Sequence, residues 1–219
     1  MIQLSASDGF AFKAYVATPA GKARGAIVVM QEAFGVNKHI RAVADAYAAN
    51  GYLAVAPSAY DRVQADFESG YDEGEIKTAI GIMNQMTWDD AILDMKAAIE
   101  HASKTGKVGI VGYCWGGSAS WVAACRIPGL AAAVSYYGGA IPEFVTEKPK
   151  CPMMLHFGEK DMRPSLEQGK AIAAAHPQTQ SFFYPAGHGF NCDLRGSFDQ
   201  ESSSLALTRT MELFKEHVG

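Results

Sequence analysis

Residues 107–120 read KVGIVGYCWGGSAS, and this stretch decides the fold. Its first five residues form an apolar, β-branched run that is typical of a buried strand. Gly112, Cys114 and Gly116 then follow the pattern Gly-x-Ser-x-Gly, with cysteine in place of serine. This pattern is typical of a nucleophile elbow, in which a sharp turn between a strand and a helix lifts a reactive side chain clear of the backbone.

The elbow gives Cys114 a chemical setting that the other cysteines lack. A Cβ at Gly112 or Gly116 would crowd the neighbours of the nucleophile, so both positions favour glycine. A helix that begins near Trp115 points free N–H groups and its positive end at the sulfur, which favours the thiolate. We therefore interpret Cys114 as a nucleophile, although a buried cysteine in a glycine-rich turn is the other interpretation of the same pattern.

The composition limits the class of protein. The chain has 219 residues, of which 48% are hydrophobic and 19% charged, enough for one sizeable core and one domain over residues 1–219. The net charge of −4 argues against electrostatic binding to nucleic acid and gives no reason to expect an anionic membrane as partner. The first nine residues lack the features of a signal peptide, so we expect a cytoplasmic protein. The four cysteines have neither disulfide-motif nor metal-ligand spacing, and we expect free thiols and no metal.

Strand-like and helix-like stretches alternate along the chain. The apolar or alternating runs that predict strands are residues 13–18, 25–30, 52–56, 107–111, 131–136, 152–157 and 181–184. The stretches that predict helices are residues 39–49, 88–102, 165–175 and 207–218, with Thr87 as the N-cap of the second. The alternation predicts an α/β fold in which a mostly parallel sheet has helices on both faces, with active groups at the carboxyl ends of the strands.

Residues 61–77 interrupt this pattern. They contain six acidic residues, two basic residues and two glycines. Two interpretations are open for this segment: a solvated surface excursion, or a lid near the mouth of the site.

Two later loops supply partners for Cys114 in the order nucleophile, acid, histidine. Asp161 follows the strand at 152–157 and is preferred over Glu159 because it lies three residues beyond Gly158. His188 lies between two glycines after the strand at 181–184, a position that packing explains poorly, so we expect it to be the general base. The other histidines are expected to face solvent, except for a satisfied core residue within a strand; they are His39, His101, His176 and His217, and His156.

An acyl-transfer site also needs two donors for the oxyanion. The N–H of Trp115, directly after the nucleophile, is one candidate. The loop after the strand at 25–30 supplies the other, the N–H of Ala33. Aromatic side chains that we expect to line a substrate pocket are Phe34, Tyr60 and Tyr137, with Trp88 and Trp115 beside them.

With these residues assembled, the sequence resembles the dienelactone hydrolase family, a cysteine branch of the α/β-hydrolase fold. The resemblance spans nearly the whole chain and rests on residues 31–35 (QEAFG), 112–117 (GYCWGG), 136–138 (YYG), 158–161 (GEKD) and 187–190 (GHGF). It implies a Cys114–His188–Asp161 triad and no cofactor. It also implies that Glu32 contacts the resting thiol and takes part in forming the thiolate; a solvated loop acid is the alternative for Glu32.

The sequence departs from the family where substrate carboxylates bind. Family members that cleave dienelactone carry two arginines for this purpose, one before the mid-chain helix and one four residues after the catalytic histidine. Residues 63–87 contain no arginine, and Cys192 stands four residues after His188. Arg195 is a candidate substitute. The resemblance therefore leaves open whether the substrate is dienelactone or another ester or lactone.

The function favoured by these residues is hydrolysis of a small ester or lactone through a thioester acyl-enzyme, by a protein expected to be a monomer. A ligand-binding or sensory protein on an inactive hydrolase scaffold is the first alternative. A thiol redox protein that pairs Cys114 with Cys192 is the second.

Overall fold

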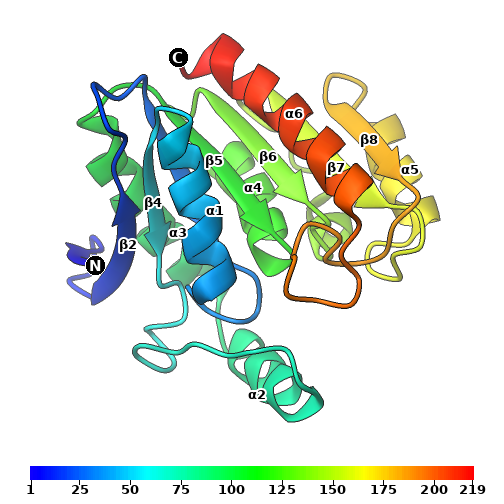
Figure 1. The fold of residues 1–219 in the computed structure, drawn as a ribbon, viewed down its shortest axis with the longest axis horizontal. Coiled ribbons are helices and arrows are strands. Elements are labelled where there is room, and N and C mark those ends of the chain that lie inside the picture. The colour runs from blue at the N-terminus through cyan, green and yellow to red at the C-terminus, as the bar shows by residue number, and fades with distance from the viewer.

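A computed structural model describes all 219 residues. Eight strands form one sheet in the order β1-β2-β4-β3-β5-β6-β7-β8 (Figure 1). The strands are β1 Ile2–Ser5, β2 Ala11–Ala17, β3 Ala26–Met30, β4 Leu53–Pro57, β5 Val108–Tyr113, β6 Ala132–Tyr136, β7 Met153–Gly158 and β8 Gln180–Tyr184. The first two strands pair antiparallel and the other six run parallel. The predicted α/β class with a mostly parallel sheet is confirmed.

Helices cover both faces of the sheet, as the alternation predicted. They are α1 Lys38–Ala49, α2 Glu73–Met83, α3 Trp88–Ser103, α4 Trp115–Arg126, α5 Leu166–Ala175 and α6 Gln200–His217, with a short 3-10 helix, η1 Ile141–Phe144. α1 and α6 lie on the face nearer the viewer in Figure 1, and α3, α4 and α5 lie on the other. Each face has its own apolar core, of 35 and 25 buried residues. None of the helices has both the length and the hydropathy that a membrane crossing requires.

Parallel strands fix where the chemistry can occur. Because β3, β5, β7 and β8 run in the same direction, the loops that follow them leave the sheet at one edge. These loops carry Glu32, Cys114, Asp161 and His188, so residues far apart in the sequence converge. The parallel topology therefore brings the predicted site residues to one edge.

The sequence patterns do not predict β1, α2 or the short η1, and one helix begins earlier than expected. β1 is a short antiparallel edge strand beside β2, and α2 lies partly within the acidic segment 61–77. The missed signal for α2 is a capping box, in which Asp72 accepts from Glu75 N and the Glu75 side chain accepts from Asp72 N. α6 begins at Gln200 rather than 207, after the N-cap Asp199.

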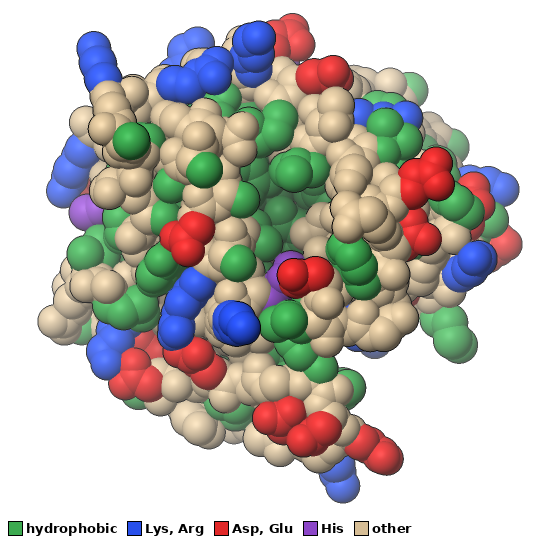
Figure 2. Space-filling model, viewed as in Figure 1, with side chains coloured by type: hydrophobic (Ala, Val, Ile, Leu, Met, Phe, Trp, Pro, Cys, Tyr) green, Lys and Arg blue, Asp and Glu red, His purple; other side chains and the backbone are tan.

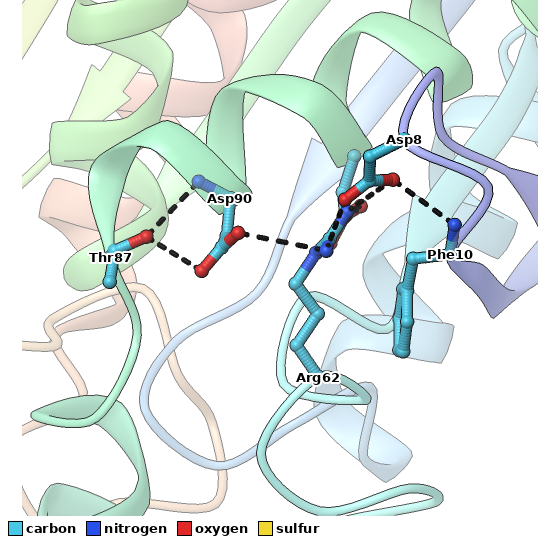
Figure 3. Close-up of polar contacts among 6 residues, drawn as sticks. Asp8, Phe10, Arg62, Thr87 and Asp90 are labelled. Carbon is cyan, nitrogen blue, oxygen red and sulfur yellow. Dashed lines mark hydrogen bonds and ion pairs between the residues drawn. The ribbon is translucent and has the colours of Figure 1, made fainter.

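One arginine, Arg62, is among the residues that hold the loop before α2 to the body of the molecule. Figure 3 shows Arg62 between Asp8 and Asp90, and its guanidinium also binds Asp94 at 2.8 Å. The Asp94 side chain is 3% exposed, and its burial raises its pKa more than the hydrogen bonds from Arg62 lower it. Such a pair adds little net stability, but either charge alone would be costly, so the pair fixes the path of the loop.

Two histidines expected to face solvent are buried. His176, at the C-terminal end of α5, packs its ring edge against Trp121 with centroids 4.8 Å apart, and its Nε2 lies 2.6 Å from the Val145 carbonyl oxygen. His39, near the start of α1, is 4% exposed and pairs with Asp193. The expectation was wrong for both, because helix position alone does not reveal which neighbouring element covers a helix end.

The core histidine on β7 is fully satisfied, as predicted. His156 Nδ1 lies 2.8 Å from the Tyr184 hydroxyl, and Nε2 lies 3.0 Å from the Thr210 hydroxyl, which in turn lies 2.8 Å from the Tyr136 hydroxyl. Burial, assisted by the charge of Arg209, lowers the pKa of His156 to about 3. The network therefore requires neutral imidazole.

This network predicts acid destabilisation that begins near pH 6.5. Below that pH the unfolded chain binds a proton at residue 156 that the folded chain excludes, so stability falls until the pH reaches the folded pKa. We expect about 2 kcal/mol to be lost between pH 7 and pH 5 from this residue. The measurement is urea unfolding of wild type and His156→Gln at pH 5, 6, 7 and 8. The glutamine variant should lose less stability between pH 7 and pH 5, and an identical loss in both proteins would contradict the assignment.

Candidate active site

The turn after β5 holds Cys114 in a backbone conformation that few residues adopt. Its φ is 56° and its ψ is −117°, outside the ordinary regions for a non-glycine residue, at a cost of about 1–3 kcal/mol. The turn is fixed on both sides, because Cys114 N donates to Tyr136 O at 3.0 Å and Gly116 N donates to Gln31 O at 3.0 Å. The strained turn therefore holds the partly exposed Cys114 in a fixed position.

The two elbow glycines are required by close backbone contacts, as predicted. A Cβ on Gly112 would overlap the Gly116 carbonyl, and a Cβ on Gly116 would overlap the carbonyl oxygens of Met30 and Gln31. The second contact presses the elbow against the loop that follows β3. That loop carries Glu32 directly after Gln31, so glycine at 116 also brings Glu32 to the site.

The later loops bring an acid and an imidazole together. Asp161 Oδ2 lies 2.8 Å from His188 Nδ1, and Asp161 Oδ1 accepts from Arg163 N at 2.8 Å. Both oxygens of this buried carboxylate are therefore engaged, whereas Glu159 is exposed. An arrangement of this kind fixes the orientation and the tautomer of the imidazole.

His188 lies close enough to Cys114 for the two side chains to interact. Burial disfavours the charged form of His188, but the charge of and hydrogen bond to Cys114, together with those of Asp161, outweigh burial and raise the pKa of His188 to about 10. The His188 side chain remains 29% exposed, so the imidazole can meet both the protein and an entering molecule. An imidazole that Asp161 holds next to Cys114 can exchange a proton with that side chain.

Two backbone N–H groups flank the elbow without an intramolecular acceptor. Trp115 is the first residue of α4, and a first-turn N–H has no acceptor within its own helix. The Ala33 N–H, in the loop after β3, makes no hydrogen bond within the chain. Both residues lie in segments joined by the Gly116–Gln31 hydrogen bond, so these donors are available close to the nucleophile.

Aromatic rings surround the elbow. The partly exposed Trp115 ring stacks on Trp88 with centroids 5.7 Å apart and planes 7° apart, and the edge of Tyr60 meets Trp115 at 5.2 Å. Tyr60 is 1% exposed, so Trp115 packs against a buried ring on this side. Tyr137 packs against His188 at 5.1 Å. These rings place rigid, apolar surfaces next to the elbow and next to His188.

Glu32 is buried behind this arrangement rather than solvated. It is 1% exposed, and neither of its carboxylate oxygens has a hydrogen-bond partner. The nearest cation is Arg195, whose guanidinium lies 3.6 Å from Glu32 Oε1 and also packs over the Phe34 ring at 5.6 Å. The sequence does not show where Arg195 lies. In the structure its guanidinium lies against Gly189, directly after His188.

The acidic segment is not a purely solvated excursion. Its acidic residues are mostly exposed and α2 stands out from the body of the molecule (Figure 1), but Phe67 is buried. Tyr71 packs edge-on against Phe34 with centroids 4.6 Å apart, and Ser69 N donates to Phe34 O at 3.0 Å. The segment therefore covers the loop that carries Glu32, a contact that no local pattern in residues 61–77 signals.

Comparison with known proteins now identifies the family. The family model described as "Dienelactone hydrolase family" matches residues 12–218, nearly the whole chain. The chain belongs to the dienelactone hydrolase family. A relative from Synechocystis sp. named "Putative carboxymethylenebutenolidase" is 32% identical over 209 residues, which cover 86% of this chain and 85% of the relative.

Two further dienelactone hydrolase relatives agree. "Carboxymethylenebutenolidase 1" of Cupriavidus pinatubonensis is 29% identical over 224 residues, covering 97% of this chain and 94% of the relative. A crystal structure described as a "Putative Dienelactone Hydrolase" from Klebsiella pneumoniae superposes with a TM-score of 0.83 at 27% identity over 98% of both chains. These matches confirm the α/β-hydrolase fold and make this chain a dienelactone hydrolase-like hydrolase.

The elbow glycines give a direct test of the local geometry. Gly116→Ala should destabilise the protein by about 3 kcal/mol or more, because its methyl group overlaps two backbone oxygens that cannot move independently of β3. Gly81→Ala is the matched control: it lies in α2 with nothing within 4 Å of its Cβ position, and should gain up to about 1 kcal/mol. Denaturant unfolding of both variants distinguishes the cases, and equal stability would refute the packing argument.

Proposed function

We propose that this dienelactone hydrolase relative cleaves a small carboxylic ester or lactone, with Cys114 as nucleophile, His188 as general base and acid, and Asp161 as the residue that orients His188. The observation that carries the proposal is the 2.8 Å contact between Asp161 and His188 beside a strained elbow cysteine. Backbone strain and a buried acid–imidazole pair each cost folding free energy, so finding them side by side indicates a functional site.

The proposed reaction is acyl transfer to water. The Cys114 thiolate attacks the carbonyl carbon, and the N–H groups of Trp115 and Ala33 stabilise the oxyanion. Collapse expels the alkoxide, which takes its proton from the His188 imidazolium, and leaves a thioester on Cys114. His188 then removes a proton from water, which attacks the thioester; the acid is released and the thiolate restored. A dienelactone-type lactone would undergo the same ring opening.

The charge near the site favours a substrate that carries a carboxylate. Arg195 packs on Phe34, and its side chain keeps 20% exposure and more N–H groups than one contact with Glu32 can use. From this position Arg195 can bind a substrate carboxylate, which is the role that two arginines at other sequence positions have in the family. The relatives named carboxymethylenebutenolidase support the same substrate class.

The nucleophile is tested by Cys114→Ala in hydrolysis of p-nitrophenyl acetate and of small lactones. We expect turnover to fall at least about a thousandfold, with His188→Ala similarly impaired and Cys125→Ser serving as the control. Turnover by Cys114→Ala at the wild-type rate would disprove the mechanism.

Thiol labelling provides an independent readout. Burial raises the pKa of Cys125 to about 12 and that of Cys151 and Cys192 to about 11, the last with help from the charge of Glu32. These three thiols stay protonated near neutral pH, so iodoacetamide should modify Cys114 first. Equal labelling rates at all four positions would remove the case for an activated thiolate.

Substrate class is tested at Arg195. Arg195→Gln should lower kcat/KM for a carboxylated lactone relative to its neutral methyl ester by about tenfold or more, since a charge-assisted hydrogen bond is lost. Arg126→Gln is the matched control, a partly exposed arginine paired with Glu147 at the far end of α4 from Cys114. If Arg195→Gln leaves the ratio at its wild-type value, the substrate is held by other groups.

A further inference from the structure

Three side chains that can bind a metal converge at the edge of the sheet that carries the proposed active site. A carboxylate oxygen of Glu32, a ring nitrogen of His39 and Cys192 Sγ all lie within 4.8 Å of one another. Each residue is buried, with exposures of 1%, 4% and 0%. They come from three separate segments: the loop after β3, the start of α1 and the loop after β8.

These donor atoms lack the partners that buried polar groups ordinarily have. Both oxygens of Glu32 and the Nε2 of His39 are buried without a hydrogen-bond partner. Buried side-chain polar atoms nearly always find one, and an absent ion or water is a standard explanation for exceptions. Arg195 forms an ion pair with Glu32 Oε1 at 3.6 Å, which is beyond hydrogen-bond length, so both carboxylate oxygens remain without a hydrogen bond.

Outer contacts hold two of the three donors as metal ligands are held. His39 Nδ1 lies 3.2 Å from Asp193 Oδ1, so the imidazole has a carboxylate on one nitrogen and a free Nε2 on the other. Ligating histidines commonly have such a carboxylate partner, which fixes the tautomer. Cys192 Sγ donates to the Tyr71 hydroxyl at 3.3 Å, which also accepts from Asn37 Nδ2 at 3.1 Å. Two of the three possible ligands are therefore held in place by further side chains, as the ligands of a metal site are.

We propose that Glu32, His39 and Cys192 bind a divalent transition-metal ion, with Zn²⁺ the best fit, and that this ion inhibits the hydrolase. One oxygen, one imidazole nitrogen and one thiolate suit zinc, whereas Mg²⁺ and Ca²⁺ prefer oxygen ligands alone. Zinc–ligand distances of about 2.0–2.3 Å require the three atoms to close in by about 1 Å. The ion takes the place of the Cys192 thiol proton, which is released to solvent.

The fold offers an approach to this site and a route to inhibition. His39 and Asp193 line a groove of about 240 Å³ between α1 and α6, visible in Figure 2 as a hollow with hydrophobic side chains at its floor. Ala33 directly follows Glu32, so an ion that pulls Glu32 toward His39 and Cys192 displaces the N–H group that is proposed as an oxyanion donor. The inhibition rests on the proposed function, whereas the binding does not.

Binding is tested by calorimetric titration of the full chain with Zn²⁺, and by Co²⁺ absorption, which reports thiolate ligation and tetrahedral geometry. We expect one ion per chain. His39→Gln, Cys192→Ser and Glu32→Gln should each weaken binding by about a hundredfold, since losing even an outer partner costs 10–100-fold. Cys151→Ser and His101→Gln, which alter a thiol and an imidazole elsewhere, should bind as wild type does. Thermal melts verify that each variant is folded.

Two outcomes would overturn the site. One is the absence of a stoichiometric ion together with no thiolate–Co²⁺ absorption in the wild type. The other is binding that survives Cys192→Ser but is lost in Cys114→Ser, which would place the ion on the nucleophile and His188 instead.

Inhibition is measured separately on p-nitrophenyl acetate. Zinc should inhibit the wild type reversibly, with activity restored by a chelator, and should inhibit Cys192→Ser only at far higher concentration. Equal inhibition of both proteins would refute the regulatory role. If zinc binds as described but Cys114→Ala retains turnover, the proposed hydrolase mechanism fails while the metal site stands. If Cys114→Ala loses turnover but the wild type binds no zinc, the hydrolase mechanism stands and the metal site fails.

Discussion

One backbone contact positions the whole site: the approach of the turn after β5 to the loop after β3, where Gly116 N donates to Gln31 O at 3.0 Å. Only a residue without Cβ permits this approach. The contact joins the turn that carries the strained Cys114 to the loop that carries Glu32 and Ala33. The proposed nucleophile, a candidate oxyanion donor and a buried carboxylate thus share one rigid support, as preorganised catalysis would require.

Charge is the second constraint on this edge of the sheet. Two buried carboxylates lie at this edge, Asp161 and Glu32, and each has a different partner. Asp161 has both oxygens engaged and holds His188, whereas Glu32 has no hydrogen bond and only Arg195 nearby. Both oxygens of Asp161 already have hydrogen-bond partners, whereas both oxygens of Glu32 can still accept hydrogen bonds or bind an ion. That difference explains why Asp161 suits a fixed orienting role, while Glu32 suits a role that changes when a substrate or an ion arrives.

The loops around the site depend on contacts remote from it. Arg62 joins the chain before α2 to Asp8 and Asp94, and Tyr71 reaches from the same segment to Phe34. A long, acidic, externally projecting segment therefore has one side anchored in the site. Substitutions in residues 61–77 can act on the loop after β3 without touching the reacting groups.

The sequence alone determined the seven principal strands, the helix periods and the likeness to dienelactone hydrolases, because apolar periodicity and the glycines of the elbow are local properties. It also singled out Cys114, Asp161 and His188, since each follows a strand. Only the tertiary structure decided that Glu32 is buried, that His39 faces inward and that Arg195 lies beside the site. Those outcomes depend on which distant segments cover a residue, and burial of this kind leaves no trace in the residue's own neighbours along the chain.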